Sequence, residues 1–323
     1  MSSRKGFPMR PFARLVIALA LMLAPTVAMA ETVRFGVGPA GNWDTAIVDI
    51  GVKAGIFRKH GIEVQSFYTD GSGQTLQAVL SGSVDIGSAV GTQGAMGAFA
   101  KGAPIRIIGG QATGASNFWY VRSDSPLRSM ADIKPETTIG YSSAGASTHI
   151  FALGFVADNG GRGKVVATGS PVATLTQVMS GQIDIGWSSP PIGYEAAQRG
   201  DIRIIAKATD VERIREQTIR TLVASKSFID TKPETLRKFL DAYRETVAFM
   251  YAGDAGVALY AEVAKQPVDA ARQVRDAFPR SIVDPDNFRG IAALQADAVT
   301  YKFLSQPLTD AQLKELILVP GAR

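Results

Sequence analysis

The chain has 323 residues, of which 46% are hydrophobic, and it contains no cysteine and only two histidines. This length and composition suffice for two ordinary domains with cores of their own. They exclude disulfides, thiolate catalysis and cysteine-based metal sites, and the scarcity of histidine argues against a multi-histidine metal centre.

The first 30 residues have the pattern of an export signal. A basic start is followed by the apolar run from Leu15 to Ala24, and Ala28-Met29-Ala30 supplies the small residues that a signal peptidase requires. We therefore expect Sec-dependent export, cleavage after Ala30 and a periplasmic mature protein. Four of the 34 Lys and Arg residues lie in this segment, which leaves 30 basic against 29 acidic residues in the remainder. That balance gives no reason to expect a nucleic-acid partner.

Expected strands and helices alternate along the first part of the mature chain. The strands are expected at 33–37, 63–68, 84–87 and 105–108, and the helices at 45–57, 75–80 and 93–100. Their type follows from runs of β-branched residues and from apolar residues at helical spacing. This order predicts a mostly parallel sheet with helices on both faces.

The same order returns about one hundred residues later. Thr75–Gly87 is repeated as Thr174–Gly186 at an offset of 99, and Ile105–Ile108 as Ile202–Ile205 at an offset of 97. In this second unit the strands are expected at 137–142, 165–167, 183–187 and 202–205, and the helices at 147–157 and 172–179. A repeat of this length has the size of a domain. We therefore expect two similar α/β domains with a ligand cleft between them.

Two expected strands, Asn117–Arg122 and Thr221–Ala224, belong to neither repeat. They are expected to pass between the domains in opposite directions as a two-stranded hinge. From Lys232 onwards the pattern is helical, and this tail is expected to pack on the first domain. The expected boundaries are 31–115 with 221–323 for a discontinuous lobe I, and 116–220 for lobe II.

The loops that follow the expected strands are rich in Gly, Ser and Thr and poor in charge. In open parallel sheets, ligands bind beyond the carboxyl ends of the strands. Several of these loops lead into helix N-termini, which favour anions. The loop from Ser142 to Thr148 is therefore the best candidate for holding an acidic group. Trp43 and Trp187 are expected to face each other across the cleft and to stack on a flat or apolar part of the ligand.

Each of these features also has a structural interpretation. Ser and Gly after strands are common in turns and N-caps, and Trp43 could equally cover the edge of the first sheet. His149 fits an ordinary half-buried residue of a helix. Asp85 and Asp184 occupy equivalent positions inside strands of the two repeats, where they suit the capping of a neighbouring turn better than a catalytic pair. No catalytic residue is expected.

Three further stretches carry a resemblance to a known family. They are Ala54–Phe57 with Gly61–Val64, Leu80–Gly87, and Ala131–Lys134 leading to Ile139–Ser142. Together with the export signal and the glycine-rich loop after the first strand, this pattern resembles the periplasmic substrate-binding proteins of nitrate, sulfonate and taurine ABC importers. That group includes binders of thiamine-pyrimidine precursors. The resemblance covers about residues 31–225 and is specific for the family rather than for the ligand.

The resemblance implies a periplasmic-binding-protein clamshell of two α/β lobes that closes on a small molecule and delivers it to an ABC permease in the inner membrane. It implies a monomer that is not an enzyme and needs no metal or cofactor. Carried over by position, the family's ligand-binding loops fall on Asn42, Trp43, Ala89, Val90, Ser142, Ser143, Ala144, Gly145, Ala146, Trp187 and Ser188, and the strand-end loops add Ser72, Gln111 and Ser147. No Arg or Lys is found among these loops, which favours a small organic ligand with a sulfonate- or carboxylate-type end over a strictly inorganic oxyanion.

Three alternatives share the fold: an enzyme of thiamine-pyrimidine or quinone biosynthesis, the sensing domain of a transcriptional regulator, and a binding protein that serves a sensor kinase. The export signal argues against the first two. The lack of cysteine and the scarcity of histidine also reduce the catalytic repertoire, and no helix-turn-helix pattern is found. The third alternative stays open, because the sequence does not distinguish uptake from sensing.

Overall fold

The computed structural model describes residues 30–322. The expected export signal, Ala30 excepted, lies outside the described residues, so that expectation stays a prediction. Within the described range, no helix is both long enough and apolar enough to cross a membrane.

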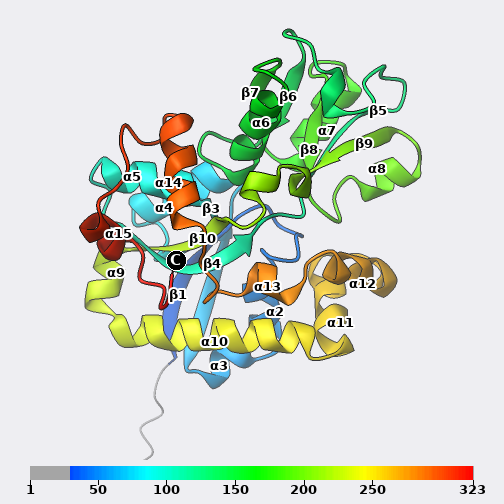
Figure 1. Ribbon diagram of the computed structural model, residues 1–323. Helices are drawn as coiled ribbons and strands as arrows, with labels where there is room; N and C mark the ends of the chain where they lie inside the picture. The colour runs from blue at the N-terminus through cyan, green and yellow to red at the C-terminus, as the bar shows by residue number, and fades with distance from the viewer. Residues whose placement is uncertain (1–29, 323) are drawn as a thin grey trace, which may run out of the picture. The chain divides into compact units, whose positions relative to one another are not determined.

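The first sheet is mostly parallel, as the sequence predicts (Figure 1). Its strands are β1 (Glu31–Val37), β2 (Ile62–Tyr68), β3 (Ile86–Gly91), β4 (Ile105–Thr113) and β10 (Thr218–Ser225), in the order β2-β1-β3-β10-β4. β1 runs parallel to β2 and β3, whereas β10 runs antiparallel to β3 and β4. Because β10 is antiparallel, its first residues lie at the edge where the parallel strands end.

The second sheet repeats this arrangement. Its strands are β5 (Phe118–Arg122), β6 (Thr138–Tyr141), β7 (Lys164–Ala167), β8 (Gly186–Ser188) and β9 (Ile202–Lys207). β8-β5-β9 and β6-β7 form two hydrogen-bonded groups, which meet at a parallel bridge between Ile139 of β6 and Ile185, the residue before β8. The resulting order, β7-β6-β8-β5-β9, matches that of the first sheet, with β5 in the antiparallel place of β10. The sequence repeat is therefore a repeat of topology.

The chain passes from the first sheet to the second after β4 and returns before β10. The two expected linking strands are β5 and β10, and each becomes the antiparallel strand of the sheet that it enters. The passages touch where the amide N–H of Gly114 donates to the carbonyl of Gln217 at 2.9 Å, beside the pairing of Thr113 with Thr218. Any rotation of one sheet against the other has to occur at these passages.

Helices cover both faces of each sheet (Figure 1). Those on the first sheet are α2 (Ile47–Lys53), α3 (Ile56–Lys59), α4 (Ser72–Leu80), α5 (Thr92–Ala100), α9 (Lys226–Thr231), α10 (Pro233–Tyr251), α11 (Asp254–Val263), α12 (Val268–Asp276), α13 (Arg280–Val283), α14 (Ile291–Thr300) and α15 (Asp310–Leu316). Those on the second sheet are α6 (Ser147–Asp158), α7 (Pro171–Met179) and α8 (Tyr194–Gln198). Short 3-10 turns occur at Met130–Asp132, Ala208–Asp210 and Glu212–Ile214.

The helical tail packs on both faces of the first sheet. On one face, α10 buries Phe239, whose ring lies 5.5 Å from that of Phe35 in β1. On the other face, Leu294 of α14 and Leu316 of α15 join the core that contains Val84. The tail therefore completes the hydrophobic core of the first sheet rather than forming a layer of its own.

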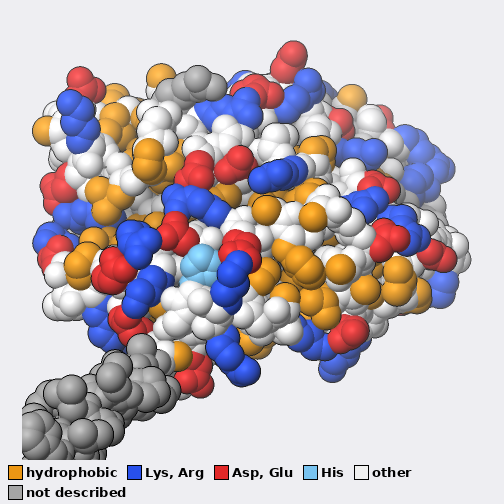
Figure 2. Space-filling model, turned by 90° about the horizontal axis from the view of Figure 1, so that it is seen from below, with side chains coloured by type: hydrophobic (Ala, Val, Ile, Leu, Met, Phe, Trp, Pro, Cys, Tyr) orange, Lys and Arg blue, Asp and Glu red, His pale blue; other side chains and the backbone are white. Residues whose placement is uncertain are grey.

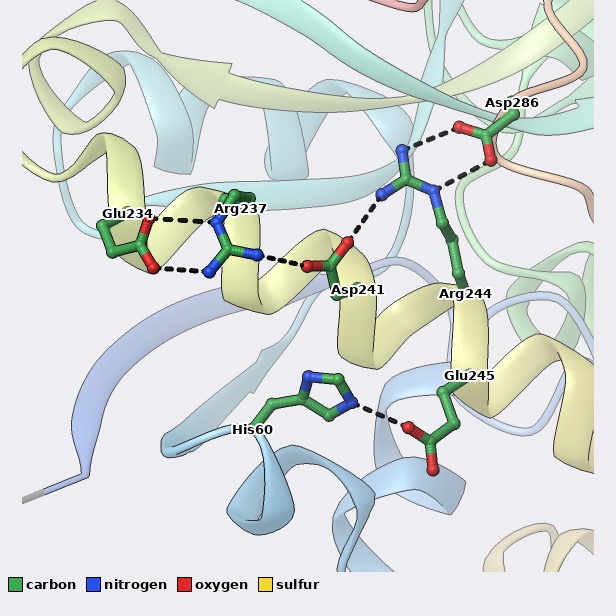
Figure 3. A network of polar contacts seen from close by, with 7 residues as sticks. All are labelled: His60, Glu234, Arg237, Asp241, Arg244, Glu245 and Asp286. Carbon is green, nitrogen blue, oxygen red and sulfur yellow. Dashed lines mark hydrogen bonds and ion pairs between the residues drawn. The ribbon is translucent and has the colours of Figure 1, made fainter.

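The outer face of α10 carries a chain of ion pairs (Figure 3). Arg237 lies between Glu234 and Asp241, and Arg244 joins Asp241 to Asp286, with two contacts of 2.8 Å to the latter carboxylate. Exposed pairs of this kind contribute at most about 1 kcal/mol each, so burial of the inner face accounts for most of the helix's stability. Viewed from this side, the surface mixes Lys and Arg with Asp and Glu (Figure 2), as the balanced count of charges predicts.

Candidate functional site

Loops from both sheets enclose a small hollow. Its lining consists of Pro39, Asn42, Gly71, Ser72, Ala89, Asn117, Ser142, Ala146, Ser147, Thr148, Trp187, Ser189 and Arg220. From the first sheet the contributions come from the loops after β1 and β2 and from β3 itself, and from the second sheet they come from β8 and the loops after β6 and β8. This is the strand edge where open parallel sheets bind ligands. The hollow measures about 30 Å³, which is room for two or three water molecules at the roughly 10–15 Å³ that each needs.

Half of the predicted site residues meet at this hollow. They are Asn42, Ser72, Ala89, Ser142, Ala146, Ser147 and Trp187. The indole Nε1 of Trp187 donates to the hydroxyl of Thr168 at 3.1 Å, and the side chain is only 3% exposed. That hydrogen bond fixes the ring as one wall of the hollow.

Trp43 does not line the hollow, and the prediction that it faces Trp187 is wrong. Its side chain is fully buried in the core of the first sheet. The indole Nε1 donates to the hydroxyl of Tyr251 at 2.7 Å, and the ring lies edge-on to Tyr260 at 4.8 Å. Both partners come from the helical tail, about 200 residues away, so no local pattern around Trp43 could reveal them.

Three other predicted residues support the site from behind. Val90 is fully buried in the core that lies under α5. Gln111 accepts from the amide of Ala89 and donates to the carbonyl of Asp44 at 3.1 Å, so it holds two loops together. The hydroxyl of Ser188 donates to the carbonyl of Ile192 at 2.7 Å, which shapes the loop after β8. None of the three lines the hollow.

The remaining predicted residues, Ser143, Ala144 and Gly145, lie where the two sheets touch. The hydroxyl of Ser143 accepts from the amide of Gly73 at 3.2 Å. A Cβ atom added to Gly91 would overlap the carbonyl oxygen of Gly145, and one added to Gly94 would lie 2.9 Å from the same oxygen. We call the contacts of Gly73, Gly91 and Gly94 with Ser143 and Gly145 the glycine seam. The two sheets can approach this closely only because Gly91 and Gly94 have no side chains.

Arg220, which the sequence reasoning missed, is the charged group of the hollow. It lies on β10, is 6% exposed, and its Nη1 lies 2.8 Å from Oδ2 of Asp44. Its Nε and Nη2 have no hydrogen-bond partner among the described residues. Because the sequence reasoning considered only the loops after parallel strands, the beginning of an antiparallel strand escaped it. An Arg in the cleft also removes the reason given for disfavouring an inorganic oxyanion.

The partner of Arg220 is itself deeply buried. Asp44 is 1% exposed, and neither carboxylate oxygen receives a well-directed hydrogen bond from the described residues. Burial raises the pKa of Asp44 above its ordinary value, and the charge of Arg220 acts against that rise. The contact is therefore a charge pair that leaves part of the hydrogen-bonding capacity of both groups unused.

Other polar atoms around the hollow also lack partners. Oδ1 of Asn42, Oδ1 of Asn117 and Oγ of Ser189 are buried and make no hydrogen bond within residues 30–322. An unsatisfied buried group costs about 1–3 kcal/mol, so proteins rarely gather several without a use for them. Together with the free edge of Arg220, these atoms can surround a small polar group from several sides.

The N-terminus of α6 faces the same hollow. Ala146, the residue before the helix, offers no side-chain cap, and Ser147 and Thr148 line the hollow. Ser142 is held in place by the hydroxyl of Thr148, at 3.0 Å from its amide and 2.8 Å from its own hydroxyl. The free amides and the dipole of a helix N-terminus favour an anion, which adds to the positive charge of Arg220.

The other titratable residues singled out by the sequence have structural contacts. Burial lowers the pKa of His149 to about 4, and its ring stacks on Tyr141 at 4.0 Å. Asp85 accepts from the backbone and side chain of Arg34, and Asp184 accepts from the amide of Thr138 at 2.8 Å. Both aspartates thus have structural contacts, as expected, but they bind the neighbouring strands β1 and β6 rather than capping a turn, and each lies just before a strand rather than inside it. Within residues 30–322, no cluster of three or more acidic or histidine side chains is placed to hold a metal ion.

The chain has relatives among known proteins. A family model described as NMT1/THI5 like matches residues 42–254. A protein of Brucella abortus (strain 2308), provisionally named a binding protein, is 34% identical over 134 residues, which cover 39% of this chain and 40% of that protein. The match with such curated relatives thus spans about two-fifths of their length.

Solved structures share the fold over nearly the whole described chain. The alkanesulfonate-binding protein SsuA from Xanthomonas axonopodis pv. citri, bound to MOPS, has a TM-score of 0.73 at 19% identity, over 88% of this chain and 97% of that one. The desulfurization enzyme DszB has a TM-score of 0.61 at 16% identity, over 90% and 97%. At these identities the likeness establishes the fold, which serves binding proteins as well as an enzyme.

Proposed function

The chain belongs to the NMT1/THI5-like family, and from that membership and its periplasmic-binding-protein fold we propose that it is the extracytoplasmic solute-binding component of an ABC importer. Its ligand is a small organic anion with a sulfonate or carboxylate group, held in the hollow between the two sheets. The binding proteins among its relatives support this function over that of an enzyme. The protein acts in the periplasm as a monomer and passes the ligand to a permease.

One observation carries the choice of ligand. Arg220 is buried and lines the hollow, and its Nη1 pairs with Asp44, while its Nε and Nη2 have no hydrogen-bond partner in the described part of the chain. These two nitrogens form the edge of the guanidinium that binds a carboxylate or sulfonate through two parallel hydrogen bonds. The N-terminus of α6 and the hydroxyl groups of Ser142 and Ser147 supply donors from the second sheet.

The proposed lobes follow the two sheets. Lobe I comprises residues 31–115 and 221–323, and lobe II comprises residues 116–220. Arg220 lies just before the boundary at residue 221, on β10 of the first sheet. A ligand that contacts Arg220 and the Ser142–Thr148 loop of the second sheet makes both sets of contacts only when the two sheets are together. Its binding therefore shifts the population towards the closed form by the difference in affinity for the two forms. The permease would then meet the rims of both lobes.

A thermal-shift screen of the purified protein tests the proposed function. The compounds are methanesulfonate, benzenesulfonate, benzoate, nitrate and, as an uncharged control, benzyl alcohol. A ligand at about 100 times its dissociation constant stabilises the folded state by about 2.7 kcal/mol, so the organic anions should raise the melting temperature by several degrees. Stabilisation by the uncharged compound alone would contradict the proposal. Recovery of each compound unchanged after incubation distinguishes binding from catalysis.

A further inference from the structure

A second space lies next to the hollow and is large enough for an organic group. It measures about 390 Å³, within the roughly 300–1,000 Å³ typical of small-molecule pockets. The hollow itself, at about 30 Å³, can take an acidic head group but no carbon skeleton. We call the larger space the side pocket; it is lined by residues of β5, α8 and β9 on one side and by residues of and around α12 and α13 on the other.

The walls of the side pocket suit a flat or apolar group. Tyr194 and Phe118 form a stacked pair, with ring centres 5.4 Å apart and ring planes inclined by 16°. Ile204 lies on the same side, and Ala277 and Ile282 line the pocket from the tail. Tyr194 is half-buried, so part of its surface is open to the pocket. Such a surface offers stacking and apolar contact, and the lining also includes one cationic and one anionic residue, Lys207 and Asp276.

Asn117 connects the side pocket to the hollow. The residue lines both spaces. Nδ2 donates to the carbonyl of Ser188 at 3.4 Å, while Oδ1 is buried and has no hydrogen-bond partner among residues 30–322. The chain after β8 also runs from one space to the other, since Ser189 lines the hollow and Tyr194 lines the side pocket. Asn117 and the loop after β8 are therefore where the two spaces adjoin.

We propose that the side pocket binds the ring or alkyl portion of the same ligand whose acidic group pairs with Arg220. The inference rests on the proposed function, and it narrows the ligand to sulfonates or carboxylates that carry an aromatic ring or an alkyl chain. Tyr194 is then a residue that determines specificity. It discriminates among acids by their carbon skeleton, whereas Arg220 contacts the group that they share.

Calorimetric titration of variants with methanesulfonate, benzenesulfonate and 2-naphthalenesulfonate tests the inference. The wild-type protein should bind the two aromatic compounds more tightly than methanesulfonate. Tyr194→Ala should weaken binding of the aromatic compounds roughly tenfold, because a lost aromatic contact costs about 0.5–1.5 kcal/mol beyond the burial of area. The affinity of this variant for methanesulfonate should stay within about twofold of the wild-type value. Tyr194→Phe keeps the ring and should retain aromatic binding.

A matched control and a second variant keep the result unambiguous. Tyr68 is 56% exposed on β2. Tyr68→Ala removes the same kind of side chain there and should leave the affinity for all three compounds unchanged. If Tyr194→Ala does not fold, Ile282→Ala tests the opposite wall and should show the same selective loss.

Equal losses for methanesulfonate and the aromatic compounds would overturn the inference while leaving the proposed function in place. Failure of the wild-type protein to bind any of the three would overturn the proposed function and the side pocket with it.

Discussion

Arg220 is the residue on which the proposed site depends most. A buried guanidinium is costly unless it is paired and its remaining N–H groups are satisfied. Asp44 provides the pairing at 2.8 Å, and a bound acid would satisfy Nε and Nη2. The carboxylate thus orients the guanidinium while leaving its free edge towards the hollow. Binding and stability are therefore linked at this pair and have to be measured separately.

Arg220→Gln should weaken binding of benzenesulfonate by about 100-fold, since truncating one side of a buried charge pair costs about 2–5 kcal/mol. It should also lower the free energy of unfolding by about 3 kcal/mol, because Asp44 is left buried and unpaired. Combining it with Asp44→Asn removes that charge, so urea unfolding should show most of the stability regained while calorimetry still shows weak binding. Recovery of binding in the double variant would contradict the role assigned to Arg220.

His149 makes the folded protein sensitive to mild acid. Burial lowers its pKa to about 4 in the folded state, from 6.5 for an exposed histidine. At a pH between these two pKa values, His149 binds a proton more readily in the unfolded chain than in the folded protein. The free energy of unfolding therefore falls as the pH drops from 7 to 5. With allowance for the partial exposure of the ring, the loss should be about 1 kcal/mol.

The variant His149→Phe keeps the stacking on Tyr141 and removes the titration. Urea unfolding at pH 7 and pH 5 should give a smaller decrease for this variant than for the wild type. An identical decrease in both proteins would show that His149 is charged in the folded state as readily as in the unfolded one.

At the scale of elements, the glycine seam decides how closely the two sheets approach. Gly91 ends β3 with an ordinary extended backbone, φ −64°, so alanine fits its own strand. The obstacle is the carbonyl of Gly145, which belongs to the loop before α6 of the second sheet. A methyl group at position 91 therefore opposes closure without disturbing the sheet that carries it.

The melting temperature of ligand-free Gly91→Ala should stay within a few degrees of the wild-type value. Its affinity for benzenesulfonate should fall about tenfold or more, since overpacking typically costs about 1–3 kcal/mol. Gly253→Ala is the matched control, because a Cβ at position 253 meets no atom within 4 Å. Small-angle scattering with the ligand should show a less compact particle for Gly91→Ala than for the control. Unchanged affinity would mean that the sheets do not close along this seam.

The sequence predicted these elements well where the information is local or repeated. Alternating strands and helices, and the recurrence of Thr75–Gly87 at 174–186, sufficed for two mostly parallel sheets. The candidate site could be predicted in part, because loops at the carboxyl ends of parallel strands meet wherever such a sheet forms. Trp43 and Arg220 were assigned wrongly or missed, because their roles depend on α10, α11 and an antiparallel β10 that come from distant parts of the chain.

At the scale of the whole molecule, the size of the hollow requires the two halves to separate. A space of about 30 Å³ is enclosed by loops of both sheets, and a direct hydrogen bond from Gly73 to Ser143 joins them at the seam. We expect a ligand with a carbon skeleton to reach Arg220 after this contact opens. The chain connections at Gly114 and Gln217, joined by a hydrogen bond of 2.9 Å, are where we expect the movement to occur.

A disulfide between positions 73 and 143 would test this requirement. A Cβ atom at Gly73 would lie 3.5 Å from Cβ of Ser143, at the short end of the roughly 3.5–4.5 Å found in disulfides, and the chain has no other cysteine to compete. The double variant Gly73→Cys, Ser143→Cys should bind benzenesulfonate at least about tenfold more slowly when oxidised, because the closed form then lacks an entry route. Reduction should restore the wild-type rate in stopped-flow fluorescence, and each single variant should behave alike with and without reductant. Equal rates in the oxidised and reduced double variant would show that the ligand enters without separation of the two sheets at this seam.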